Sequence, residues 1–84
     1  MDRPELSRRV LELLTGVAPD VDPALVIPGV AFREQFDFDS MDTLNFAIAI
    51  HRELGVEVPE ADYAQLASLD KCLDFLGPRL SPGI

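Results

Sequence analysis

The sequence predicts a small all-α protein: a four-helix bundle with three longer helices, one short third helix and a long first loop. Apolar residues recur at helical spacing in three separate segments, and turn-forming residues follow each of them. Residues 56–59 alternate like a strand, but no second segment could pair with them. Because 48% of the 84 residues are hydrophobic, the chain can form one core, and we expect a single domain over residues 1–84.

The first helix is expected over residues 3–15, and the long loop over residues 17–39. The helix is marked by an apolar stripe that consists of Leu6, Val10, Leu13 and Leu14. Gly16 is expected to end it in a left-handed conformation. The loop contains several prolines but stays rich in apolar residues, so we expect one helical turn over residues 31–36.

A second helix is expected to begin at Asp39 or Ser40 and to end at Leu54. Asp39 is a suitable N-cap, and Asp42 places negative charge at the positive end of the helix dipole. Gly55 is expected to close the helix. The stripe expected to be buried consists of Phe46, Ala47, Ile50 and Leu54.

Two more helices are expected after the extended connector. The short third helix covers residues 59–66, and Ser68 is expected to cap the fourth. Gly77 and Pro78 are expected to end this last helix. Its buried stripe consists of Leu69, Cys72, Leu73 and Leu76.

Ser40 is the candidate for chemistry, because it stands at a helix start between acidic residues and after an apolar loop. The order of elements over residues 6–76, with its D-S-M-D segment and its later G-V-E-V-P connector, resembles the acyl carrier protein family. That family has an aspartate-serine-apolar motif at the start of its second helix and a G-[IV]-x-[IVL]-P connector after it. The resemblance implies an acyl-carrier-like bundle in which a phosphopantetheinyl transferase, using coenzyme A and magnesium, attaches 4′-phosphopantetheine to Ser40. It also implies that Asp39 assists this modification.

The function that the resemblance implies is that of a carrier and not of an enzyme. The arm would hold acyl intermediates as thioesters and present them to loading, condensing or acyl-transfer enzymes. Asp37 stands where the family commonly has glycine, and Asn45, His51 and Arg52 stand where carriers of fatty acid synthesis usually have glutamates. These departures favour a specialised lipid or secondary-metabolite pathway. An aminoacyl or peptidyl carrier and an unmodified helical interaction domain are the alternatives.

The expected partner-binding surface lies on the second helix. Because the buried stripe of that helix is complete without them, Met41 and Leu44 are expected to be partly exposed. The residues expected to bind partners are Met41, Asp42, Leu44, Asn45, Ile48, His51 and Arg52.

Charge and composition limit the other functions. A formal charge of -8 disfavours nucleic acid and anionic lipid and favours basic protein partners. We expect a location in the cytoplasm, because the first residues form neither a signal peptide nor a membrane span. We also expect a discrete carrier, since the sequence begins at Met1 and ends soon after the last expected helix, and a monomer.

Catalytic and metal sites are not expected. One cysteine and one histidine exclude an intramolecular disulfide and a Cys/His zinc cluster. An EF-hand count from Asp37 fails, which leaves at most a weak surface cation site. His51 would lie about 16 Å along the helix from Ser40, too far to activate its hydroxyl.

Overall fold

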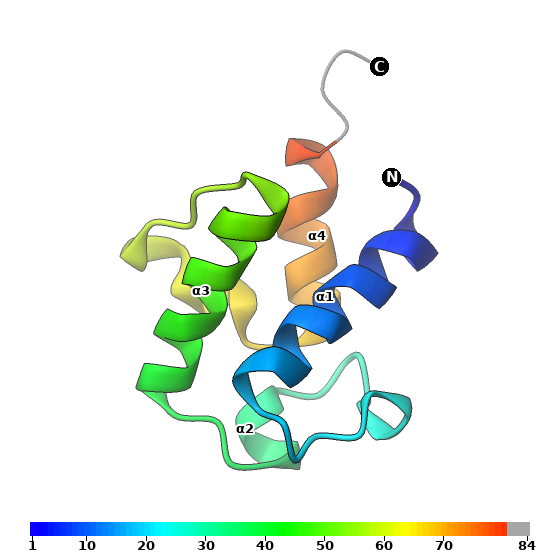
Figure 1. Cartoon of the computed structure of the whole chain (residues 1–84), viewed down its shortest axis with the longest axis vertical. Helices are drawn as coiled ribbons and strands as arrows, with labels where there is room; N and C mark the ends of the chain where they lie inside the picture. Colours follow the sequence, from blue (N-terminus) through cyan, green and yellow to red (C-terminus); the bar gives the residue numbers. More distant parts are fainter. Residues whose placement is uncertain (81–84) are drawn as a thin grey trace.

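The computed structural model describes residues 1–80 (Figure 1). Its longer helices are α1 (Arg3–Val17), α3 (Ser40–Leu54) and α4 (Leu69–Arg79), and α2 (Phe32–Gln35) is a single turn. Two 3-10 helices, η1 (Pro23–Leu25) and η2 (Glu60–Leu66), complete the secondary structure of these residues, which include no strand. The predicted all-α fold, with three longer helices and a short helix before the last, is therefore confirmed.

The three longer helices pack together through α1. α1 contacts both α3 and α4, and η2 contacts α3 and α4. The long loop with η1 and α2 lies below these helices in Figure 1, at the end of the bundle where α1 stops and α3 begins. The loop therefore reaches the start of α3 from beneath the bundle.

The core joins the four α-helices and η2. Phe32 of α2 and Phe46 of α3 are fully buried, together with Val10, Leu14, Ile50, Leu66, Cys72 and Leu76. Leu13 and Leu54, which the helical stripes placed in the core, are only half-buried at its edge, whereas Ala49 and Phe75 are buried outside the predicted stripes. Core residues thus come from α1, α2, α3, η2 and α4.

The long loop is tied to the bundle by backbone hydrogen bonds. The N–H of Phe32 donates to the carbonyl of Ala67 at 2.7 Å, and the N–H of Asp70 donates to the carbonyl of Pro28 at 3.0 Å. Both bonds join the loop to the start of α4. They give hydrogen-bond partners to backbone groups that would otherwise lose their contact with water when the loop packs on the core.

Two predicted helix ends are wrong. α1 continues through Gly16 to Val17, because Gly16 does not adopt a positive φ and the N–H of Ala18 still donates to the carbonyl of Leu14. α4 continues through Pro78 to Arg79. A proline disfavours helical backbone in the preceding residue partly through that residue's Cβ, and here the preceding residue is Gly77, which has none.

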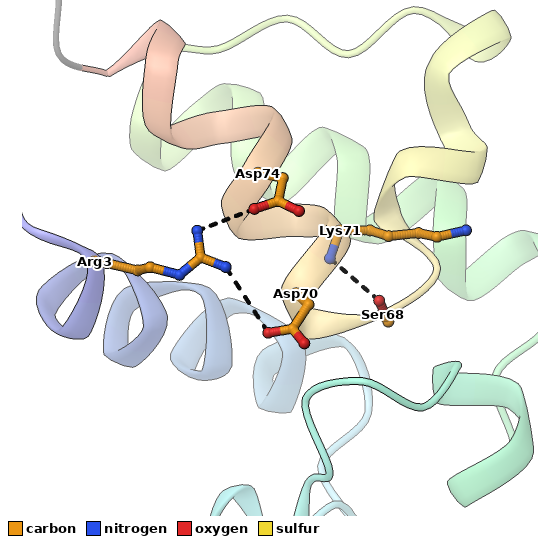
Figure 2. Close-up of polar contacts among 5 residues, drawn as sticks. All are labelled: Arg3, Ser68, Asp70, Lys71 and Asp74. Atoms are coloured by element: carbon orange, nitrogen blue, oxygen red, sulfur yellow. Dashed lines mark hydrogen bonds and ion pairs between the residues drawn. The ribbon is translucent and has the colours of Figure 1, made fainter.

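An exposed charged cluster joins the first turn of α1 to α4 (Figure 2). The Arg3 guanidinium lies 3.1 Å from Asp74 and 3.9 Å from Asp70. All three side chains are more than half exposed, so this contact stabilises the fold by at most about 1 kcal/mol. Lys71, on the same helix, extends away from the cluster.

Candidate functional site

Ser40 is the first residue of α3, and it is exposed. A reciprocal capping box fixes the first turn of the helix, which contains Ser40: the N–H of Asp42 donates to Asp39 Oδ1 at 2.9 Å, and the N–H of Asp39 donates to Asp42 Oδ2 at 3.0 Å. The helix start predicted from Asp39 and Asp42 is confirmed. The far end is also as predicted, since Gly55 closes α3 with a φ of 72°.

Several polar groups at this helix start stay available for a ligand. Among the hydrogen bonds formed within residues 1–80, none uses the Ser40 hydroxyl, the N–H of Ser40 or the N–H of Met41. Asp39 Oδ2 is likewise outside these bonds. An exposed hydroxyl beside free N–H groups at the positive end of a helix suits a covalently attached phosphate ester.

Four phenylalanine rings hold the loop that leads to Ser40. Phe32 lies 5.7 Å from Phe36 and 5.5 Å from Phe38 between ring centroids, and Phe38 lies 6.1 Å from Phe46 of α3. Asp37, between two half-buried rings, is exposed. The alternation of aromatic and acidic residues therefore anchors the loop on one side and leaves its charge in solvent.

The outward face of α3 carries exposed apolar residues, as predicted. Met41 is 60% exposed, Ile48 is 50% exposed and Leu44 is 36% exposed. Asn45, His51 and Arg52 are exposed too, whereas Asp42 is half-buried in the capping box. Arg52 Nε lies 3.0 Å from Glu53 Oε2, so part of its charge is offset within α3, which the sequence pattern did not indicate.

Ser40 also lines a surface groove that the sequence did not predict. Its walls come from the loop with α2, from α3, from η2 and from α4; they include Ala31, Arg33, Phe38, Asp39, Thr43, Tyr63, Ala64, Ala67 and Lys71. No local motif reveals this groove, because η2 and α4 are distant from Ser40 in sequence and meet it only through the packing of the bundle.

The remaining candidates lie away from Ser40 or are inaccessible. His51 is exposed near the opposite end of α3. Burial raises the pKa of the Cys72 thiol to about 12, which keeps it protonated at neutral pH. Within residues 1–80, no group of three or more histidine, cysteine or acidic side chains is placed to hold a metal ion.

A small helical bundle that presents an exposed serine at a capped helix start has the architecture of a carrier domain. Residues 8–76 match the family described as "Phosphopantetheine attachment site". An acyl carrier protein of Thermosynechococcus vestitus is 31% identical over 75 residues, which are 86% of this chain and 93% of the relative. This chain therefore belongs to the acyl carrier protein family.

Two relatives that are named as mitochondrial have longer chains than this protein. Mitochondrial acyl carrier protein 2 of Arabidopsis thaliana is 30% identical over 90% of this chain and 60% of its own length. The mitochondrial acyl carrier protein of Neurospora crassa is 28% identical over 90% of this chain and 57% of its own length. This chain thus spans less than two thirds of either relative.

Membership of the acyl carrier protein family defines the cofactor of this protein and its general role. The matched domain is the attachment domain for covalent 4′-phosphopantetheine, and acyl carrier proteins serve acyl-handling enzymes as carriers and not as catalysts. No helix within residues 1–80 has the length and hydrophobicity needed to cross a lipid bilayer.

Proposed function

We propose that Ser40 is the residue that carries the 4′-phosphopantetheine arm. The observation that carries this proposal is the position of Ser40, an exposed hydroxyl at the first residue of α3, directly after the N-cap Asp39. The arm supplies a thiol that holds an acyl group as a thioester. The protein itself contributes the attachment oxygen and the surface that partner enzymes recognise.

A phosphopantetheinyl transferase would join the Ser40 oxygen to the phosphorus of coenzyme A that carries the pantetheine. The hydroxyl proton leaves, and the adenosine bisphosphate portion of coenzyme A is released. Asp39 is proposed to assist through Oδ2, which takes no part in the capping box. A carboxylate there can attract the magnesium ion that accompanies coenzyme A.

Mass spectrometry tests this assignment. Wild type incubated with coenzyme A, magnesium and a broad-specificity transferase should gain one phosphopantetheine, and Ser40→Ala should gain none. Ser7→Ala is the matched control, because Ser7 lies on α1 and its variant should be modified like wild type. An unmodified wild type would contradict the proposal and favour the alternative, an unmodified helical interaction domain.

We further propose that partners dock on the outward face of α3, through Met41, Asp42, Leu44, Asn45, Ile48, His51 and Arg52. Exposed apolar residues supply contact area, and the surrounding charges select the partner. Because His51 and Arg52 carry no negative charge, enzymes that recognise a uniformly acidic helix should bind this one weakly. The proposed pathway is therefore a specialised lipid or secondary-metabolite pathway, with an aminoacyl or peptidyl carrier as the alternative.

Charge reversal on α3 tests this docking surface. The triple variant Asn45→Glu, His51→Glu and Arg52→Glu, converted to the holo form, should be loaded faster than wild type by an acyltransferase of general fatty acid synthesis. Conversion to the holo form, checked by mass, is the control for folding. Equal loading rates would show that these residues do not select the partner.

We also propose that the protein is a single-domain monomer in the cytoplasm. Sedimentation at several concentrations tests the monomer, and cell fractionation distinguishes the cytoplasm from an organelle, the location stated in the names of two relatives. Loading by an amino-acid-activating enzyme in preference to an acyltransferase would establish the aminoacyl carrier instead.

A further inference from the structure

Two basic side chains line the groove that contains Ser40. Lys71 is on α4 and Arg33 is on α2, and both are exposed. Neither takes part in the ion pairs found within residues 1–80, which join Arg3 to Asp70 and Asp74, Arg8 to Glu12, and Arg52 to Glu53. Ser40 therefore shares its groove with two cations that have no carboxylate partner within residues 1–80.

The directions of the side chains on α4 separate Lys71 from its acidic neighbours. Figure 2 shows Asp70 and Asp74 turned toward Arg3, while the Lys71 side chain extends away from them. The backbone N–H of Lys71 is fixed by Ser68 Oγ at 3.2 Å. The ammonium group is therefore free to meet an anion on the side of α4 that borders the groove.

The start of α3 offers a phosphate on Ser40 only the N–H groups of Ser40 and Met41. Its capping box already spends the N–H groups of Asp39 and Asp42, and the N–H of Thr43 donates to the Asp39 carbonyl. A phosphodiester on Ser40 would also lie close to two carboxylates, which repel it. The groove cations would offset this repulsion.

We propose that Lys71, together with Arg33, pairs with the phosphodiester that links the arm to Ser40. This inference rests on the proposed attachment at Ser40. Lys71 is the main partner, because Arg33 also borders grooves that are lined by Asp37 and Asp42. An ammonium group on a flexible stem can follow the phosphate, and its bond to an anionic oxygen is charge-assisted. The pairing draws the phosphate end of the arm toward α4.

Phosphorus NMR of the holo protein tests this pairing without any partner enzyme. The variants are Lys71→Gln, Arg33→Gln, the double variant, and Arg9→Gln, which removes one charge from α1 outside the groove. We expect the phosphodiester resonance to move in Lys71→Gln, to move further in the double variant and to stay in place in Arg9→Gln. The differences should disappear near 1 M salt, where the screening length is about 3 Å.

Amide resonances give a second measurement. Modification should shift the amides of Ala64 and Ala67, which line the groove, and Lys71→Gln should reduce these shifts about twofold, as expected for an exposed ion pair. Circular dichroism confirms that each variant is folded. Coincident phosphorus resonances in all fully modified proteins at low salt would overturn the pairing alone, whereas a wild type without added mass would remove the attachment at Ser40 as well.

Discussion

Replacing Asp39 with alanine removes the carboxylate that caps α3, and we expect a loss of about 1 kcal/mol in the free energy of unfolding, with an upper limit of about 2 kcal/mol. The variant leaves the N–H of Asp42 without the acceptor that now lies 2.9 Å away. For a domain of this size, about 1 kcal/mol lowers the melting temperature by about 4–8 °C.

Two companion variants separate the cap from its charge. Asp39→Asn keeps a side-chain oxygen of equal capping strength, so its stability should stay within a few tenths of a kcal/mol of wild type. Asp42→Ala removes the bond that Asp42 Oδ2 accepts from the N–H of Asp39, at a cost of about 0.5–1 kcal/mol. Because the two bonds form between the same pair, the double alanine variant should lose less than the sum of the single losses.

Thermal and urea unfolding measure the cap, and the rate of phosphopantetheine transfer measures the proposed assistance by Asp39. Asp39→Ala should lose both stability and transfer rate, whereas Asp39→Asn should lose only transfer rate. A melting temperature of Asp39→Ala within about 1 °C of wild type would refute the capping argument. Transfer to Asp39→Asn at the wild-type rate would refute the role of the charge.

Variants at four other positions test the bundle that supports the site. Phe46→Ala should cost about 3–5 kcal/mol in urea unfolding, because its fully buried ring contacts two other phenylalanines; Phe46→Leu should cost clearly less. Gly55→Ala should destabilise the fold by about 1–2 kcal/mol, because Gly55 has a φ of 72°. Gly16 is helical and a Cβ added there meets no atom within 4 Å, so Gly16→Ala should stabilise the fold by about 0.5–1 kcal/mol. Cys72 should resist alkylation at pH 8 until the protein is unfolded. The pKa of the Cys72 thiol is about 12 in the folded protein and 9.0 ordinarily, so the stability that the buried neutral thiol contributes should be complete below pH 9 and lost as the pH rises toward 12. Unfolding measured against pH should show this loss in wild type and not in Cys72→Ala.

The start and end of α3 could be predicted because their signals are local. An N-cap and a first-turn acid are three residues apart, and a glycine in the left-handed conformation needs no distant partner. The exposure of Met41 and Leu44 was predictable for a related reason: the stripe predicted for the same helix already supplied a buried face without them. These predictions required only the geometry of one helix.

The ends of α1 and α4 could not be predicted by the same rules. A glycine permits a left-handed cap but does not require one, and the packing of α1 on α3 and α4 continues the helix past Gly16. The η1 turn was not predicted, because Asp22 and Pro23 were interpreted only as residues that interrupt a helix. Asp22 in fact caps η1, since its Oδ1 accepts a hydrogen bond from the N–H of Ala24. The groove beside Ser40 depends on contacts between α2, α3, η2 and α4, which one sequence does not reveal.

The separation of core and surface on α3 explains how partner choice could change without loss of the fold. Phe46, Ala47 and Ile50 hold the helix in the core, whereas His51 and Arg52 are exposed in its last turn. Positive charge there interacts favourably with the helix dipole, by about 0.3–1 kcal/mol for each charged group, and the exposed pair between Arg52 and Glu53 contributes no more. Glutamates at positions 51 and 52 would lose the favourable interaction of Arg52 and add two unfavourable ones of similar size, a cost of about 1–3 kcal/mol in all. They would leave the core contacts of Phe46, Ala47 and Ile50 in place and would make acidic the surface that a docking enzyme meets. Selection for a particular partner can therefore act on this face without changing the core contacts of the helix that presents Ser40.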